Sequence, residues 1–215
     1  MTDATPPESS AAPAPGPGGA TEFRKPRKRF ILIGLGIGVV IVLLIGLFTS
    51  LGTNPSSTGA PHEGGAVPSF TASNLGPVGP SQVSVPADGG GNGTPAVLLF
   101  FGAWCSSCRQ ELPPLTAVVR RQEKQGGALA RIRVIGVDSF DGTSTAKSFI
   151  RTEGVTFPVA TDPQADITSG LFYFKGDPYT VFVNGNGTIN KIVIGAQLTP
   201  ASFTADERAL IPSGT

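Results

Sequence analysis

The two cysteines of this 215-residue chain, Cys105 and Cys108, are separated by two serines and follow an apolar run, AVLLFF, at residues 96–101. The run predicts a buried strand, and helical spacing begins directly after the first cysteine. A cysteine at a helix N-terminus lies where unpaired N–H groups and the helix dipole stabilise an anion. We therefore expect the Cys105 thiol to ionise more readily than a free cysteine. We expect Cys108, one turn further on, to be more buried and close enough to form a disulfide with it.

Several kinds of chemistry suit such a pair of cysteines, and the sequence favours catalytic thiol redox chemistry. A structural disulfide stays open as an alternative, and half of a zinc site would need ligands from a partner chain. A four-ligand zinc site of Cys and His is excluded within one chain, because the chain has two cysteines and one histidine. Covalent haem attachment requires a histidine directly after the second cysteine, and Arg109 occupies that position. We therefore expect no metal and no cofactor.

The elements that must position the dithiol follow the order of an α/β domain. Beyond the first strand, the patterns predict strands at 131–137, 179–183 and 188–194. They predict helical segments at 106–124, interrupted by Pro113 and Pro114, at 143–150, at 162–172 and from 200 onward. Thr143 and Thr199 are expected to cap the helices that they precede. Residues 67–95 are rich in Gly and Pro, and we interpret them as a loose hairpin or irregular cover rather than core. The fold predicted is a central mixed β-sheet flanked by helices on both faces.

The N-terminal part of the chain has a different composition. Residues 1–29 are rich in Ala, Pro and Gly, end in a basic cluster, and are expected to form a disordered tail. Residues 30–49 are expected to form a transmembrane anchor, because an uncharged apolar segment of this length spans a bilayer as a helix. A cleaved signal peptide would have a shorter apolar core and a small-residue cleavage site. Residues 50–66 are expected to be a flexible linker, and residues 67–215 a folded domain.

Charge places these parts relative to a membrane. Basic residues cluster only on the N-terminal side of residues 30–49, so the positive-inside rule predicts a cytoplasmic N-terminus and an extracytoplasmic domain. The predicted location is a bacterial-type plasma membrane, crossed once, with the lipid bilayer contacting the chain through residues 30–49. A net charge of +1 argues against a nucleic-acid partner.

The sequence Trp104-Cys105-Ser106-Ser107-Cys108 after an apolar strand resembles the active-site motif of the thioredoxin fold. Its details are most similar to the TlpA/ResA/CcmG-type membrane-anchored thiol-disulfide oxidoreductases. Further matches extend over roughly residues 67–212: Val67-Pro68-Ser69-Phe70, Pro113, Phe157-Pro158-Val159 and Gly176-Asp177-Pro178-Tyr179-Thr180. The resemblance implies a thioredoxin-like fold for residues 67–215.

The resemblance also implies roles for three residues near the dithiol. Glu111 lies three residues after Cys108 on the same predicted helix face. The family carries a glutamate there that manages the proton of the buried cysteine, although an exposed surface glutamate is the alternative. Pro178 would follow a cis peptide bond and line the substrate groove, or be an ordinary turn proline. Trp104 would cover the dithiol.

Three features of the sequence depart from the family pattern. Asp177 precedes the proline where relatives more often have an uncharged residue, and an aspartate pointing at Cys105 would disfavour its thiolate. Two serines replace the proline-containing dipeptides that are common between the cysteines. Leu99 stands where cytoplasmic thioredoxin has a buried aspartate. These departures concern the direction of electron flow rather than the presence of dithiol chemistry.

The interpretation is a membrane-tethered, extracytoplasmic thiol-disulfide oxidoreductase with Cys105 and Cys108 as its redox-active pair. The resemblance implies that it reduces disulfides of exported proteins, with apocytochrome c in cytochrome c-type biogenesis as one candidate. Its electrons would then come from a membrane protein. An oxidant that installs disulfides in exported proteins is one alternative, and a redox-inert binding module with the same groove is another. A peroxidase is not supported, because no T-x-x-C sequence surrounds Cys105.

Overall fold

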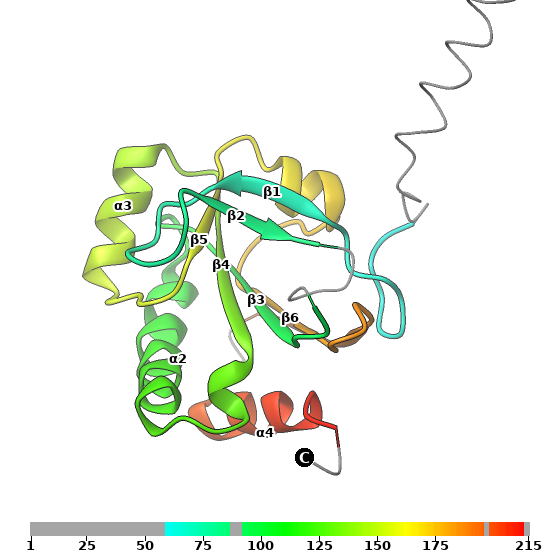
Figure 1. Cartoon of the computed structure of the whole chain (residues 1–215). Coiled ribbons are helices and arrows are strands. Elements are labelled where there is room, and N and C mark those ends of the chain that lie inside the picture. The colour runs from blue at the N-terminus through cyan, green and yellow to red at the C-terminus, as the bar shows by residue number, and fades with distance from the viewer. Residues whose placement is uncertain (1–58, 87–91, 196–197, 213–215) are drawn as a thin grey trace, which may run out of the picture. The chain divides into compact units, whose positions relative to one another are not determined.

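The structure is a computed structural model that describes residues 59–86, 92–195 and 198–212 (Figure 1). The predicted tail and transmembrane anchor, and most of the predicted linker, lie outside these residues. Within the described ranges, no helix combines the length and the apolar character needed to cross a membrane.

A five-stranded mixed sheet forms the centre of the domain, with the strand order β5-β4-β3-β6-β7. Its strands are β3 (Ala96–Phe101), β4 (Arg133–Ser139), β5 (Val159–Asp162), β6 (Tyr179–Val183) and β7 (Ile189–Ile194). Strand β3 pairs parallel with β4 and antiparallel with β6, and all of its residues are buried. A strand covered on both faces needs apolar side chains on both, which explains the continuous AVLLFF run.

Three α-helices cover one face of this sheet: α2 (Ser106–Gln125), α3 (Thr143–Thr152) and α4 (Pro200–Ala209). Alternate residues of β3, beginning at Val97, point into a core shared with Leu115 of α2, Phe149 of α3 and Phe203 of α4. Both cysteines belong to this same core. The dithiol is therefore packed against the helical face of the sheet.

The opposite face is covered by a β-hairpin and a short π-helical turn. The hairpin strands β1 (Phe70–Ser73) and β2 (Gln82–Val85) pair antiparallel, and the turn η2 spans Asp166–Leu171. Figure 1 shows the hairpin on the side of the sheet away from α2. Helical segments therefore lie on both faces, but the three α-helices share one face.

The hairpin corrects one prediction from the sequence. Residues 67–95 do contain a hairpin, but the expectation that they lie outside the core was wrong, because Val67, Phe70, Val83 and Val85 are all buried. In β2 the valines alternate with exposed Gln82 and Ser84, which places one side of the strand on the sheet. With two apolar residues per strand, this pattern is too short to stand out among neighbouring glycines and prolines.

Element boundaries differ from the predictions at three places. Helix α2 continues through Pro113 and Pro114, and strand β4 starts two residues late because residues 129–131 form a 3₁₀ turn, η1 (Leu129–Arg131). Thr143 is the first residue of α3 rather than its N-cap. The N-cap is Gly142, which has no side chain to accept a capping hydrogen bond. The capping role predicted for Thr199 is confirmed.

Candidate active site

Cys105 and Cys108 form a disulfide, with Cα atoms 5.3 Å apart, at the point where β3 passes into α2. Cys105 is the N-cap of α2, and its Sγ accepts a hydrogen bond from the Cys108 N–H at 3.0 Å. A thiolate on Cys105 would thus meet an unpaired N–H group at the positive end of the helix dipole, as the sequence predicted. Cys105 is 4% exposed and Cys108 is 1% exposed, so Cys105 is the more accessible sulfur.

The backbone between β3 and Cys105 is held by charged side chains from two elements. The Ala103 N–H donates to Asp141 Oδ2, and the Ala103 carbonyl accepts from the Arg109 guanidinium, each at 2.5 Å. Arg109 also lies over the Phe149 ring and 3.7 Å from Glu153. Sequence reasoning missed both contacts. The available signal for Asp141 was its position just after a strand, because the carboxyl ends of parallel strands gather functional groups.

Trp104 leans toward the end of β4. Its indole N–H donates to the Ser139 carbonyl at 3.0 Å, and its ring meets the Phe140 ring edge to face at 6.0 Å. Gly102 permits this placement, because a Cβ there would overlap the indole nitrogen and the Ser139 oxygen. The indole is 51% exposed, and its predicted role as a cover for the dithiol stays a prediction.

Glu111 is buried in α2 and not a surface residue, which removes the alternative left open from the sequence. Its Oε1 accepts a hydrogen bond from the Leu198 N–H at 2.9 Å. Burial raises the pKa of Glu111, and the bond from Leu198 opposes that rise. Glu111 lies three residues beyond Cys108 in α2, and its role as the proton partner of that thiol stays a prediction.

The peptide bond between Asp177 and Pro178 is cis, as the resemblance implied. Pro178 is buried directly before β6, whose first residue pairs with Phe100, so it lies beside the strand end that leads to the dithiol. The Pro178 carbonyl accepts from the Gly195 N–H at 2.8 Å. Its backbone is thus tied to the strand that follows β6.

Asp177 has both carboxylate oxygens buried, with no donor in hydrogen-bonding geometry. The pKa of Asp177 is raised to about 7, chiefly by burial and also by the charges of Asp162 and Asp141, while the nearby Ser139 hydroxyl opposes the rise. The groups that influence Asp177 are therefore those at the ends of β4 and β5. An aspartate pointing at Cys105 stays a prediction.

Asp138 is a second buried carboxyl that sequence reasoning missed. It is 0% exposed, pairs with Phe101 across the parallel β3–β4 ladder, and has no hydrogen-bond partner on either oxygen. Burial raises the pKa of Asp138 to about 8, with the charges of Asp141, Asp177 and Asp162 adding to it. The signal in the sequence was a charged residue inside the apolar run RVIGVDS.

These aspartates give the end of the sheet next to the dithiol an acidic character. Negative charge near a thiol disfavours the thiolate and so opposes the effect of the α2 N-terminus. Across the described residues, the His, Cys, Asp and Glu side chains form no group of three or more that could hold a metal ion. The chemistry available at the site is that of the two cysteines and the carboxyl groups near them.

Comparison with known proteins identifies relatives of the domain. The AhpC/TSA family model matches residues 64–192. Thiol-disulfide oxidoreductase ResA of Geobacillus thermodenitrificans is 28% identical over 99 residues, 46% of this chain and 53% of that protein. ResA of Oceanobacillus iheyensis is 30% identical over 105 residues, 48% of this chain and 51% of that protein. The chain therefore spans about half the length of these curated relatives.

Solved structures confirm the predicted thioredoxin-like fold. A secreted Mycobacterium tuberculosis disulfide oxidoreductase homologous to E. coli DsbE is 21% identical, with a TM-score of 0.53 over 66% of this chain and 96% of that chain. StoA from Bacillus subtilis is also 21% identical, with a TM-score of 0.52 over 66% of this chain and 98% of that chain. The predicted resemblance to ResA-type proteins is confirmed, with a mixed central sheet and flanking helices.

Proposed function

The chain belongs to the AhpC/TSA family, and on that premise we propose that it is a thiol-disulfide oxidoreductase whose redox centre is the Cys105–Cys108 pair. The observation that carries the proposal is the disulfide at the N-terminus of α2, where Cys105 Sγ accepts the Cys108 N–H. The names of the ResA relatives support the same activity.

The proposed reaction starts from the reduced protein. The Cys105 thiolate attacks a disulfide of the substrate, forming a mixed disulfide and releasing one substrate thiolate, which takes up a proton. Cys108 then loses its proton to Glu111 and attacks Cys105 Sγ, which releases the second substrate thiolate. Two electrons pass from the protein dithiol to the substrate disulfide, and the protein ends in the oxidised state that the structure describes.

The acidic end of the sheet favours the reducing direction. A dithiol whose thiolate is disfavoured is less stable relative to its disulfide, so it gives up electrons more readily. Asp138 and Asp177, whose pKa values are raised to about 8 and about 7, carry this charge only when ionised, so the effect on the thiolate strengthens as the pH rises. Installation of disulfides by the oxidised protein is the alternative direction. The same groups make it less favourable, since strong oxidants have a stabilised reduced form.

The cellular setting of this activity is part of the proposal and rests on the sequence. The apolar segment at residues 30–49 would anchor the chain in a bacterial-type plasma membrane, with the basic cluster before it in the cytoplasm. The domain would then act on disulfides of exported proteins, apocytochrome c among them. A membrane protein would return electrons to the Cys105–Cys108 disulfide.

The reduction potential tests this function most directly. Trp104 is the only tryptophan of the chain and adjoins Cys105, so its fluorescence in a series of dithiol and disulfide buffers reports the redox state. We expect one reversible two-electron transition near or below about −250 mV, similar to thioredoxin. The Cys108→Ser variant is the control, because it should show no such transition.

Other outcomes separate the alternatives. A potential near about −120 mV would favour the disulfide-installing oxidant. A protein with no reversible transition would instead be a binding module. In that case Cys105→Ser should retain partner binding, whereas an oxidoreductase with this substitution should lose all turnover.

A further inference from the structure

Phe140 stands out among the residues near the dithiol because it is an aromatic residue in the left-handed backbone region. Its φ is +62°, a conformation that is unusual for a bulky side chain and that glycine or asparagine adopts more easily. The side chain is nevertheless 49% exposed. Burial in the core therefore does not account for an aromatic residue at this position.

The loop that carries Phe140 is held rigidly on both sides. The Phe140 N–H donates to the Asp162 carbonyl at 3.0 Å, and the Ser139 hydroxyl bonds Thr168 at 2.8 Å. On the other side, Asp141 accepts the Ala103 N–H. The backbone that carries the ring is therefore held in place by contacts within the domain, and an ordered loop lowers the entropy cost of binding.

The Phe140 ring continues the surface of the candidate active site. It packs edge to face on Trp104, whose own ring is exposed, and Trp104 directly precedes Cys105. Two exposed aromatic rings at right angles form a corner beside the reactive sulfur. The polar atom of that corner, the indole nitrogen, already donates to Ser139, so the remaining surface is apolar.

We propose that Phe140 is a substrate-specificity residue, which with Trp104 binds an apolar or aromatic side chain two residues from the cysteine of an extended substrate segment. The inference rests on the proposed function and adds the class of substrate that the site prefers. In the mixed disulfide, the substrate sulfur is bonded to Cys105 Sγ. In an extended segment, the residues two positions from that substrate cysteine share its face and lie about 6.6 Å along the segment, so their side chains point toward the corner.

The test compares disulfide-linked homodimers of blocked five-residue peptides that share a central cysteine. The residue two positions after that cysteine is phenylalanine or serine, and 2-hydroxyethyl disulfide serves as a probe without a peptide. Each probe is mixed with the reduced full chain, and chromatography follows the released thiol. We expect the wild type to reduce the phenylalanine peptide about fivefold faster than the serine peptide, the range of one aromatic pair contact.

The variants assign this preference to the ring. Phe140→Gly and Phe140→Asn accept the backbone conformation without an aromatic ring, and the ratio of the two peptide rates should fall below about twofold. Phe140→Tyr should retain the ratio. Val78→Ser is the matched control, because Val78 is also an exposed apolar residue but its loop contacts Pro158, directly before β5, whereas the dithiol follows the end of β3.

Each result decides between the two proposals. Equal peptide rates in the wild type, or an unchanged ratio in Phe140→Gly, would overturn the role of Phe140 while leaving the oxidoreductase function intact. A ratio that falls as far in Val78→Ser would overturn it as well, since general hydrophobic adhesion would then explain the preference. No reduction of any probe, including 2-hydroxyethyl disulfide, would overturn the proposed function and this inference together.

Discussion

At the scale of single residues, the proposed reaction depends on where the proton of the Cys108 thiol goes. Cys108 must be deprotonated before it attacks Cys105, yet its sulfur is buried and has little access to water. Glu111 is a buried carboxyl one turn along the same helix, and burial raises the pKa of Glu111, which makes it a better proton acceptor. The bond from Leu198 holds this carboxyl in place.

Replacing Glu111 by glutamine should slow the second step of the reaction by at least about tenfold and change its pH dependence, because the amide cannot take the proton. The amide oxygen can still accept the Leu198 N–H, so the fold should be kept. Stopped-flow Trp104 fluorescence during reduction of 2-hydroxyethyl disulfide, recorded from pH 5 to 9, measures the effect.

Glu207→Gln is the matched control for that measurement. Glu207 is also a buried glutamate with a raised pKa, but it bonds Gln122, 14 residues beyond Cys108 and so about 21 Å along α2. Its pH–rate profile should match the wild type. An unchanged profile in Glu111→Gln would leave Glu111 with a purely structural role at Leu198.

The sequence predicted those site residues whose role depends on local spacing. Cys105, Cys108 and Glu111 share one helix, so their separation along the chain fixes their relation in space. Asp138 and Phe140 could not be found this way. Asp138 comes beside Phe101 through the β3–β4 register, and Phe140 meets Trp104 across a loop that β5 holds in place.

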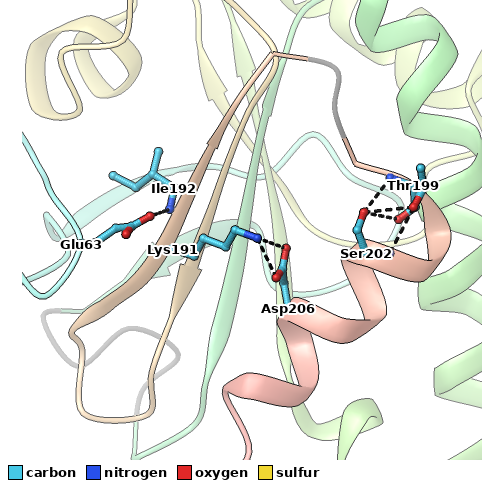
Figure 2. Close-up of polar contacts among 6 residues, drawn as sticks. All are labelled: Glu63, Lys191, Ile192, Thr199, Ser202 and Asp206. Atoms are coloured by element: carbon cyan, nitrogen blue, oxygen red, sulfur yellow. Dashed lines mark hydrogen bonds and ion pairs between the residues drawn. The ribbon is translucent and has the colours of Figure 1, made fainter.

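At the scale of elements, helix α4 joins the site to the rest of the domain. Figure 2 shows the Thr199–Ser202 hydrogen bonds that cap the start of α4 and the Lys191–Asp206 ion pair that links α4 to β7. Thr199 Oγ1 accepts the Ser202 N–H at 3.1 Å, and Ser202 Oγ accepts the Thr199 N–H at 2.9 Å. Leu198, the residue directly before this cap, donates to Glu111. The cap at Thr199 therefore fixes the start of α4 directly after Leu198, the residue that bonds the candidate proton acceptor Glu111.

Thr199→Ala should lower the free energy of unfolding by about 1 kcal/mol, because the Ser202 N–H loses its capping acceptor. Urea denaturation of the oxidised protein measures the change. Thr204→Ala is the control, since it removes a hydroxyl that only donates back to the Pro200 carbonyl within the same helix. Equal losses in the two variants would contradict a contribution from the cap.

The elements also show where sequence patterns are informative. The cap at Thr199 and the buried strand β3 were predictable because each depends on a few adjacent residues. Strand β5 was indicated only through the family resemblance at Phe157-Pro158-Val159. With four residues, its apolar pattern is too short to distinguish a strand from a loop. Its place at the sheet edge is set by pairing with β4, a contact distant in the sequence.

At the scale of the whole molecule, the domain buries several carboxyl groups, and among the described residues no ion pair to a basic side chain neutralises Asp138, Asp177 or Glu207. Burial raises the pKa of Asp138 to about 8 and that of Glu207 to about 7. Glu207 belongs to α4 and bonds Gln122 of α2, far from the dithiol. Burial also raises the pKa of Asp177 to about 7. These groups hold protons in the folded state at pH values where the same groups in the unfolded chain are ionised.

This arrangement predicts that the oxidised protein is most stable at mildly acidic pH and loses stability as the pH rises. Between the unfolded pKa near 4 and the folded values of about 7 to 8, the folded state binds more protons than the unfolded state. The free energy of unfolding therefore decreases with pH across this window, because ionising each buried carboxyl is easier after unfolding. Urea midpoints measured from pH 4.5 to 8.5 should fall steadily.

Asp138→Asn should flatten the slope, most clearly between pH 7 and 8, where Asp138 is the last of the three to ionise. The slope is the informative quantity, since the new amide also changes the absolute stability by a constant amount. A midpoint that rises with pH, or an equal slope in Asp138→Asn, would contradict a protonated aspartate at the end of β4.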